Sequence, residues 1–129
     1  MATVSRVGWL RVSYWAGAIA DGLVGVLTLV PSRMGLPGFR YPMGLAASLM
    51  IAWAVLLLWA DRKPVERRGV LPITVLVIIG LTLSGIYSVA VGLLPLSRIV
   101  PTTVLGVLLI VLMLFAYFNA AKANAPRRQ

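Results

Sequence analysis

The sequence predicts an all-α integral membrane protein, with four transmembrane helices in one up-down-up-down bundle and both termini in the cytoplasm. Sixty per cent of the 129 residues are hydrophobic, only 12% are charged, and the mean hydropathy is +0.98. Soluble domains carry about a quarter charged residues, so this composition argues against a water-soluble domain. The apolar residues also form long stretches, with most of the charged residues between them or at the chain ends.

The four apolar stretches each have a length close to that needed to span a bilayer. They cover residues 12–30, 41–60, 70–94 and 99–121. An α-helix needs about 20 residues to cross a hydrocarbon core of about 30 Å. The third stretch has no charged residue between Leu71 and Leu94. That is typical of a transmembrane helix rather than of an amphipathic helix on a soluble core.

The first stretch is predicted to be a retained helix rather than a cleaved signal peptide. Arg6 and Arg11 precede it, as in a signal peptide, but it contains Asp21. It is also longer than the apolar region of a signal peptide and lacks a small-residue cleavage site before Pro31.

Proline residues lie near the ends of the stretches. Pro42, Pro72 and Pro101 fall in the first turns of the second, third and fourth stretches, and Pro31 and Pro95 follow the first and third. Proline is tolerated at a helix start but breaks a helix interior, so four continuous helices are expected. The links at 32–40, 61–69 and 95–98 are short. Short links make consecutive helices antiparallel neighbours, so residues 1–129 are predicted to form a single domain.

The distribution of the basic residues predicts the orientation in the membrane. The chain has 12 Lys and Arg against 3 Asp and Glu, a formal net charge of +9. One side of the predicted bundle carries nine of the cations: Arg6, Arg11, Arg62, Lys63, Arg67, Arg68, Lys122, Arg127 and Arg128. The other side carries Arg33, Arg40 and Arg98. Positively charged short loops stay in the cytoplasm, which predicts a multi-pass protein of the inner (plasma) membrane.

The same distribution limits the partners that can be expected. Nine cations spread over two chain ends and one loop do not form a nucleic-acid interface, so no nucleic-acid partner is expected. Contact with membrane lipids is expected, and Arg62, Lys63, Arg67 and Arg68 are the candidates for topology signals or lipid-headgroup contacts. A protein partner at the 61–69 loop and a homo-oligomer are alternatives that the sequence leaves open.

The residue inventory excludes most catalytic and metal chemistry. There is no Cys and no His, and the only carboxylates are Asp21, Asp61 and Glu66. His is the commonest general base, and His and Cys are the commonest ligands of zinc. No cofactor, no metal site and no catalytic residue are therefore predicted, and the chain is not expected to be an enzyme.

Asp21 is the one ionisable residue well inside a predicted span. An acidic side chain at the bilayer centre costs about 2.5–3.5 kcal/mol, so such residues face the bundle interior. By depth, Thr82 and Ser84 on the third stretch lie near Asp21, with Tyr87 a turn further out. Asp21 is therefore a candidate for a proton or cation site, with Ser84 or Tyr87 as hydrogen-bond partner. A purely structural role, in which Asp21 joins two helices, is the alternative.

Small residues spaced four apart predict close helix packing. Ser13, Gly17 and Gly25 share one face with Asp21, and Gly80, Ser88 and Gly92 share a face of the third stretch with Ser84. Such stripes let two backbones approach closely in a membrane. We expect the first and third helices to pack together through them.

Two segments of the chain are 57–69 (LLWADRKPVERRG) and 15–21 (WAGAIAD). In these segments the chain resembles small uncharacterised prokaryotic four-helix membrane proteins. The resemblance implies the four-helix membrane fold, and it implies no activity and no site residue.

Three functions follow as hypotheses. The favoured one is a homo-oligomeric transporter or channel-like protein with a proton- or cation-linked Asp21. The second is a non-catalytic accessory, assembly or lipid-associated scaffold protein. The third is a membrane-embedded lipid enzyme, which would need a second polar group beside Asp21 and a pocket open to the bilayer.

Overall fold

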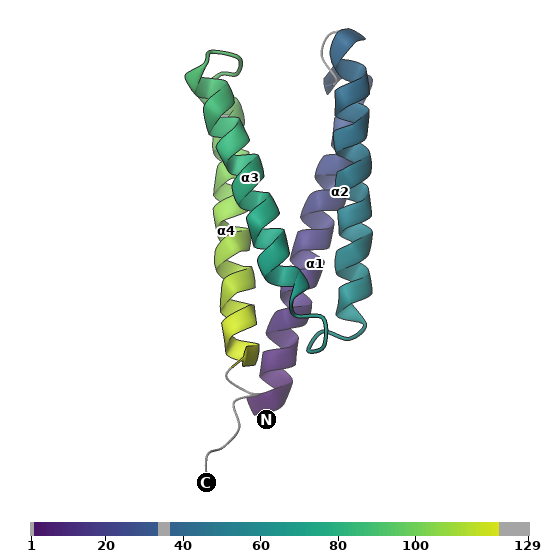
Figure 1. Ribbon diagram of the computed structural model, residues 1–129, viewed down its shortest axis with the longest axis vertical. Helices are drawn as coiled ribbons and strands as arrows, with labels where there is room; N and C mark the ends of the chain where they lie inside the picture. The colour runs from purple at the N-terminus through teal and green to yellow at the C-terminus, as the bar shows by residue number, and fades with distance from the viewer. Residues whose placement is uncertain (1, 34–36, 122–129) are drawn as a thin grey trace.

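The computed structural model is all-helical and describes residues 2–33 and 37–121. Its four long helices are α1 (Ala2–Thr28), α2 (Arg40–Asp61), α3 (Val70–Ala90) and α4 (Leu96–Ala121). Two short 3-10 turns, η1 (Pro31–Arg33) and η2 (Pro37–Phe39), lie between α1 and α2. Consecutive helices run in opposite directions (Figure 1). Lys122, Arg127 and Arg128, three of the predicted cytoplasmic cations, lie outside the described residues.

All four helices are long and apolar enough to cross a membrane, which confirms this part of the prediction. The qualifying segments are Ser5–Thr28, Pro37–Asp61, Val70–Ala90 and Leu96–Ala120. The helices differ from the predicted spans mainly at two ends. α1 begins at Ala2 rather than at residue 12, because hydropathy marks the lipid-facing segment while the helix itself continues through polar residues. α3 ends at Ala90 rather than at residue 94.

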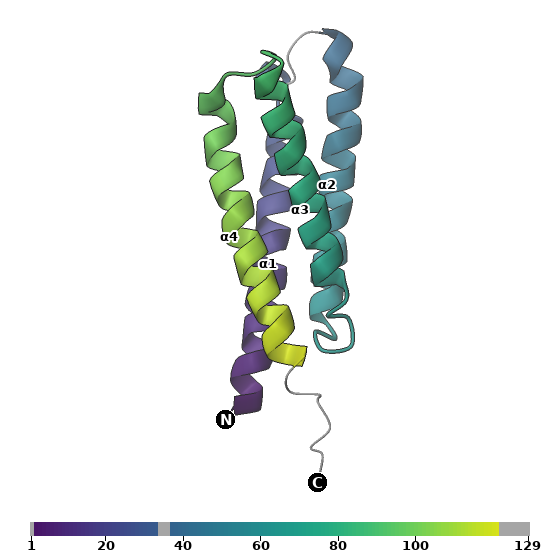
Figure 2. The ribbon, with the colours of Figure 1, turned by 60° about the vertical axis from the view of Figure 1, so that its left-hand side comes forward.

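The four helices form two arms that are joined at one end. One arm is α1 with α2 and the other is α3 with α4, and the arms separate away from the turn at residues 62–69 (Figure 1). We call the end with this turn the closed end. The opposite end, with residues 29–33, 37–39 and 91–95, is the open end, and Figure 2 shows the two ends from another side.

Buried side chains are concentrated at the closed end. The large, fully buried hydrophobic side chains are Leu10, Tyr14, Leu57, Leu71 and Met113. On α3 the buried residues lie between Leu71 and Ile78, and none of its later residues is buried. The helices are therefore packed around a common core over about half of their length.

The small residues of α1 pack against α2 and α4. A Cβ atom added at Gly17 would lie 2.8 Å from Leu57 Cδ1 and 2.7 Å from Met113 Cε. At Gly25 it would lie 3.3 Å from the carbonyl oxygen of Ala47. The predicted packing of the first helix against the third is therefore wrong. Small residues permit a close approach, but the side chains that fill the groove decide the partner, and here they come from α2 and α4.

The small residues of α3 contribute little to helix packing. Gly80 and Gly92 have nothing within 4 Å of an added Cβ, and the Ser88 hydroxyl donates to the carbonyl oxygen of Ser84 in its own helix. Gly92 instead ends α3, with a positive φ of 76°. Leu93 N–H donates to the Ser88 carbonyl (2.8 Å) and Gly92 N–H to the Val89 carbonyl (3.0 Å). This is the Schellman pattern, in which a left-handed glycine caps the helix.

Replacing Gly92 by alanine should therefore destabilise the protein, while the same change at Gly80 should not. Gly92→Ala places a Cβ in the left-handed region, which costs about 1 kcal/mol. Gly80→Ala adds a good helix former at an open helical position and should leave stability unchanged or raise it by up to about 1 kcal/mol. Unfolding in detergent micelles, followed by circular dichroism, measures both. Equal stability of the two variants would contradict the capping role of Gly92.

Candidate functional site

A cavity of about 540 Å³ lies between the arms. Residues of all four helices line it, including Asp21 of α1, Met50 of α2, Thr82 of α3 and Thr102 of α4. Its volume lies within the range of about 300–1,000 Å³ that is typical of small-molecule sites. Most of its lining side chains are apolar, so its few polar groups determine what it can bind.

Asp21 reaches this cavity from the middle of the α1 span and is half-buried. Within residues 2–33 and 37–121 the ion pairs are Arg11–Asp61 and Lys63–Glu66, so Asp21 belongs to neither. No hydrogen bond joins its carboxyl group to another described side chain. Asp21 is therefore a carboxyl group without a partner among the described residues, placed on the wall of a cavity.

The same wall also carries threonine hydroxyls, those of Thr82, Thr102 and Thr103. Thr82 and Thr102 each donate their hydroxyl proton within their own helix, to the carbonyl oxygens of Ile78 and Ile99, both at 2.9 Å. A hydroxyl has one proton and two lone pairs. With the proton committed, each oxygen can still accept a hydrogen bond from a group in the cavity.

Arg98 is the only cation among the described residues that line the cavity. It lies near the start of α4, at the open end, and its side chain is exposed. A long cationic side chain in this position extends toward the headgroup region. Arg98 therefore contributes charge to the mouth of the cavity and forms no ion pair with Asp21.

The predicted partners of Asp21 lie elsewhere on α3. Ser84 is exposed, Tyr87 is 65% exposed, and neither lines the cavity. The residues of α3 that do line it include Ile78, Leu81, Thr82 and Gly85. Their spacing of three and four residues defines one helix face. Depth along the helix suggested Ser84, but it could not show which face of α3 lines the cavity.

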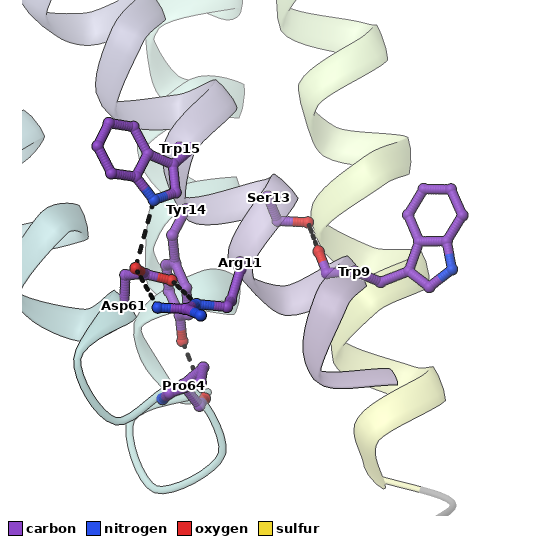
Figure 3. A network of polar contacts seen from close by, with 7 residues as sticks. All are labelled: Trp9, Arg11, Ser13, Tyr14, Trp15, Asp61 and Pro64. Carbon is purple, nitrogen blue, oxygen red and sulfur yellow. Dashed lines mark hydrogen bonds and ion pairs between the residues drawn. The ribbon is translucent and has the colours of Figure 1, made fainter. Parts of the chain in front are cut away.

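A second polar site, at the closed end, surrounds Asp61. Asp61 is only 8% exposed, although the sequence suggested a charge in an exposed loop. Arg11 Nε donates to Oδ1 at 3.2 Å, and Trp15 Nε1 donates to Oδ2 at 3.3 Å (Figure 3). Arg11 Nη2 lies 3.5 Å from Oδ2. We call these three residues the Asp61 network.

One sequence signal pointed toward this network. Arg11 and Trp15 are four residues apart, so they lie on the same face of a helix near its membrane interface. A cation and an indole N–H on one face can both donate to the same carboxylate. Asp61 is the last residue of α2, which brings its side chain to their level.

Tyr14 fixes the turn that follows Asp61. Its side chain is fully buried, and its hydroxyl lies 3.1 Å from the carbonyl oxygen of Arg67 and 3.3 Å from that of Pro64. One phenolic proton serves these two acceptors, and Figure 3 shows the contact with Pro64. A buried tyrosine hydroxyl normally finds such a partner, so the 62–69 turn is attached to α1.

The four basic residues of this turn have different environments. Arg62 and Lys63 are exposed. The Arg67 guanidinium carbon lies 3.3 Å from the centre of the Trp59 ring, and Arg67 also donates to the carbonyl oxygen of Trp59. Arg68 is half-buried, 5.9 Å from the centre of the Tyr117 ring. Arg62 and Lys63 are thus the pair best placed to contact lipid headgroups, while Arg67 has a structural role as well.

Comparison with models of protein families, with curated proteins and with solved structures finds no match. The cavity and the Asp61 network are therefore the features that bear on function. In the part of the chain that the structure describes, no group of three His, Cys, Asp or Glu side chains could hold a metal ion.

The Asp61 network predicts a difference between two charge-neutralising variants. Asp61→Asn removes the carboxylate that accepts bonds from Arg11 and Trp15, and it should lower stability by about 1 kcal/mol. Glu66→Gln removes the partner of Lys63 in a pair whose side chains are 57% and 67% exposed. That variant should be close to neutral. Thermal unfolding in micelles measures both changes, and an equal effect of the two would rule out a stabilising role of the network.

Proposed function

We propose that this protein is a homo-oligomeric transporter or channel-like protein of the inner (plasma) membrane, in which Asp21 binds a proton or a cation. The observation that supports this proposal most is the Asp21 carboxyl group, which has no partner among the described residues and lies on the wall of a cavity of about 540 Å³. An ionisable group inside a membrane span generally marks the path of an ion or substrate.

The structural alternative for Asp21 has less support. An aspartic acid that only joined two helices would hydrogen-bond a group on the neighbouring helix. In the described residues Asp21 forms no such bond. The cost of about 2.5–3.5 kcal/mol for an acidic residue in mid-bilayer is therefore not offset by any of the described residues. A bound proton or cation would offset it.

A transport path must cross both halves of the bundle. The cavity belongs to the half of the bundle near the open end, and the packed residues around Tyr14, Leu57 and Met113 occupy the other half. In our proposal a path across the membrane arises when the arms change their angle at the closed end or when a second copy of the chain contributes to it.

The closed end favours an accessory or scaffold function as the second candidate. Arg62 and Lys63 are exposed on a turn that Tyr14 holds in place. Such a turn suits anionic lipid headgroups or an acidic segment of a partner protein. A lipid enzyme has less support, since no second carboxylate lines the cavity beside Asp21 among the described residues.

The proposed orientation can be tested with single cysteine residues, because the chain contains none. A cysteine at Gly38, near the open end, should react with a membrane-impermeant maleimide in intact cells. A cysteine at Glu66, in the 62–69 turn, should react only after the membrane is made permeable, as the positive-inside rule predicts. The opposite labelling pattern would reverse the proposed topology.

The role of Asp21 can be tested by flux measurements. Asp21→Asn should abolish proton- or cation-coupled flux in proteoliposomes, because an amide cannot take up a proton or balance a cation. Glu66→Gln is the matched control: it neutralises a carboxylate outside the cavity, and flux should stay within about twofold of the original protein. Unchanged flux in Asp21→Asn, with circular dichroism showing a folded variant, would contradict the proposal.

A further inference from the structure

We infer that the Asp21 cavity binds a protonated alkylamine dissolved in the membrane, whose ammonium group donates to Asp21 and Thr82 and whose hydrocarbon body lies along the apolar wall. This inference rests on the proposed function to the extent that Asp21 is taken as the ligand-binding group. It adds the chemical class of the ligand.

Five polar side chains line the cavity: Arg98 and Thr103 can donate hydrogen bonds, whereas Asp21, Thr82 and Thr102 are available as acceptors. An ionised Asp21 can only accept, and the hydroxyl protons of Thr82 and Thr102 are already used within their own helices. A ligand that satisfies these groups must therefore donate. A primary ammonium group brings three N–H donors together with a positive charge.

The charge of the cavity lining also favours an ammonium group on the ligand. Asp21 has no ion-pair partner in the described residues, and Arg98 lies at the exposed mouth of the cavity. An unpaired carboxylate in a low-dielectric interior is costly. A ligand cation beside Asp21 removes that cost, and a hydrogen bond between two charged groups is stronger than one between neutral groups.

The cavity does not suit an inorganic cation as its whole ligand. Metal cations bind through several oxygen ligands; a calcium ion, for example, takes about 6–8. The wall near Asp21 offers one carboxyl group and a few hydroxyls, while Met43, Met50 and Val24 supply apolar surface. A volume of about 540 Å³ is also much larger than one ion. An organic cation fills the space and covers the apolar wall.

The apolar lining of the cavity also suggests the route by which the ligand enters. Leu81 and Leu105 line the cavity and yet are 54% and 41% exposed. Both lie within candidate membrane spans, so in a bilayer their exposed surface meets lipid. The cavity is thus continuous with the lipid-facing surface, and an amphiphile can reach it from the bilayer.

The methionine methyl groups provide a local test of binding. Met43 and Met50 line the cavity, while Met113 is fully buried and does not. With ¹³C-labelled methionine methyl groups and the full chain in lipid nanodiscs, dodecylammonium should shift the NMR signals of Met43 and Met50 saturably. The Met113 signal should stay in place. Assignment by single Met→Leu variants identifies each signal.

Three matched ligands separate the contributions of the positive charge, the N–H donors and the hydrocarbon chain of the ligand. Dodecyltrimethylammonium has the charge without N–H donors and should bind about tenfold more weakly. Dodecanol lacks the charge and should produce no saturable shift at the same concentration. Ethylammonium has the ammonium group without the chain and should also fail. Equal binding of dodecyltrimethylammonium, or binding of ethylammonium as strong as that of dodecylammonium, would overturn the inference.

Two variants complete the test. Asp21→Asn should weaken dodecylammonium binding by about tenfold or more, and Thr82→Val, which keeps the shape and removes the acceptor, by several-fold. An unshifted Met113 signal confirms that each variant is folded. Undiminished binding in Asp21→Asn would overturn the inference.

The flux assay distinguishes this inference from the proposed function. If flux depends on Asp21 but dodecylammonium does not bind, the ligand class is wrong and the transport proposal stands. If dodecylammonium binds through Asp21 but no flux depends on that residue, the transport proposal is wrong and the amine site stands.

Discussion

The contact of α1 with both α2 and α4 at the closed end is the constraint on which the rest of the structure depends. Tyr14 and Leu10 are fully buried there, and Gly17 lets Leu57 of α2 and Met113 of α4 approach α1 closely. Tyr14 and Arg11 also hold the end of α2 and the following turn. Because these contacts are at one end, they join the arms without determining how closely the arms approach at the other.

The membrane explains why packing can stop halfway along the bundle. In lipid there is no hydrophobic driving force between helices, so association depends on close packing and on hydrogen bonds. At the closed end both are present, in the core around Met113 and in the Asp61 network. At the open end α3 has no buried residue beyond Ile78. The helices there line a cavity instead of forming a second core.

The two aspartates illustrate how environment separates one residue type into two roles. Asp61 is more deeply buried, yet its carboxylate accepts bonds from Arg11 and Trp15, so it stabilises the closed end. Asp21 is less buried and has no partner in the described residues. A satisfied carboxylate supports a fold, whereas an unsatisfied one beside a cavity is available to a ligand.

The sequence by itself determined the four membrane-length helices, since a span of about 20 apolar residues has no other stable form in a bilayer. It also singled out Asp21, because charge within an apolar stretch is visible without a structure. Only the tertiary structure decided the partners of α1, the face of α3 that carries Thr82 instead of Ser84, and the burial of Asp61. All three features depend on the rotation of each helix about its axis and on which side chains fill a groove. Hydropathy predicts neither.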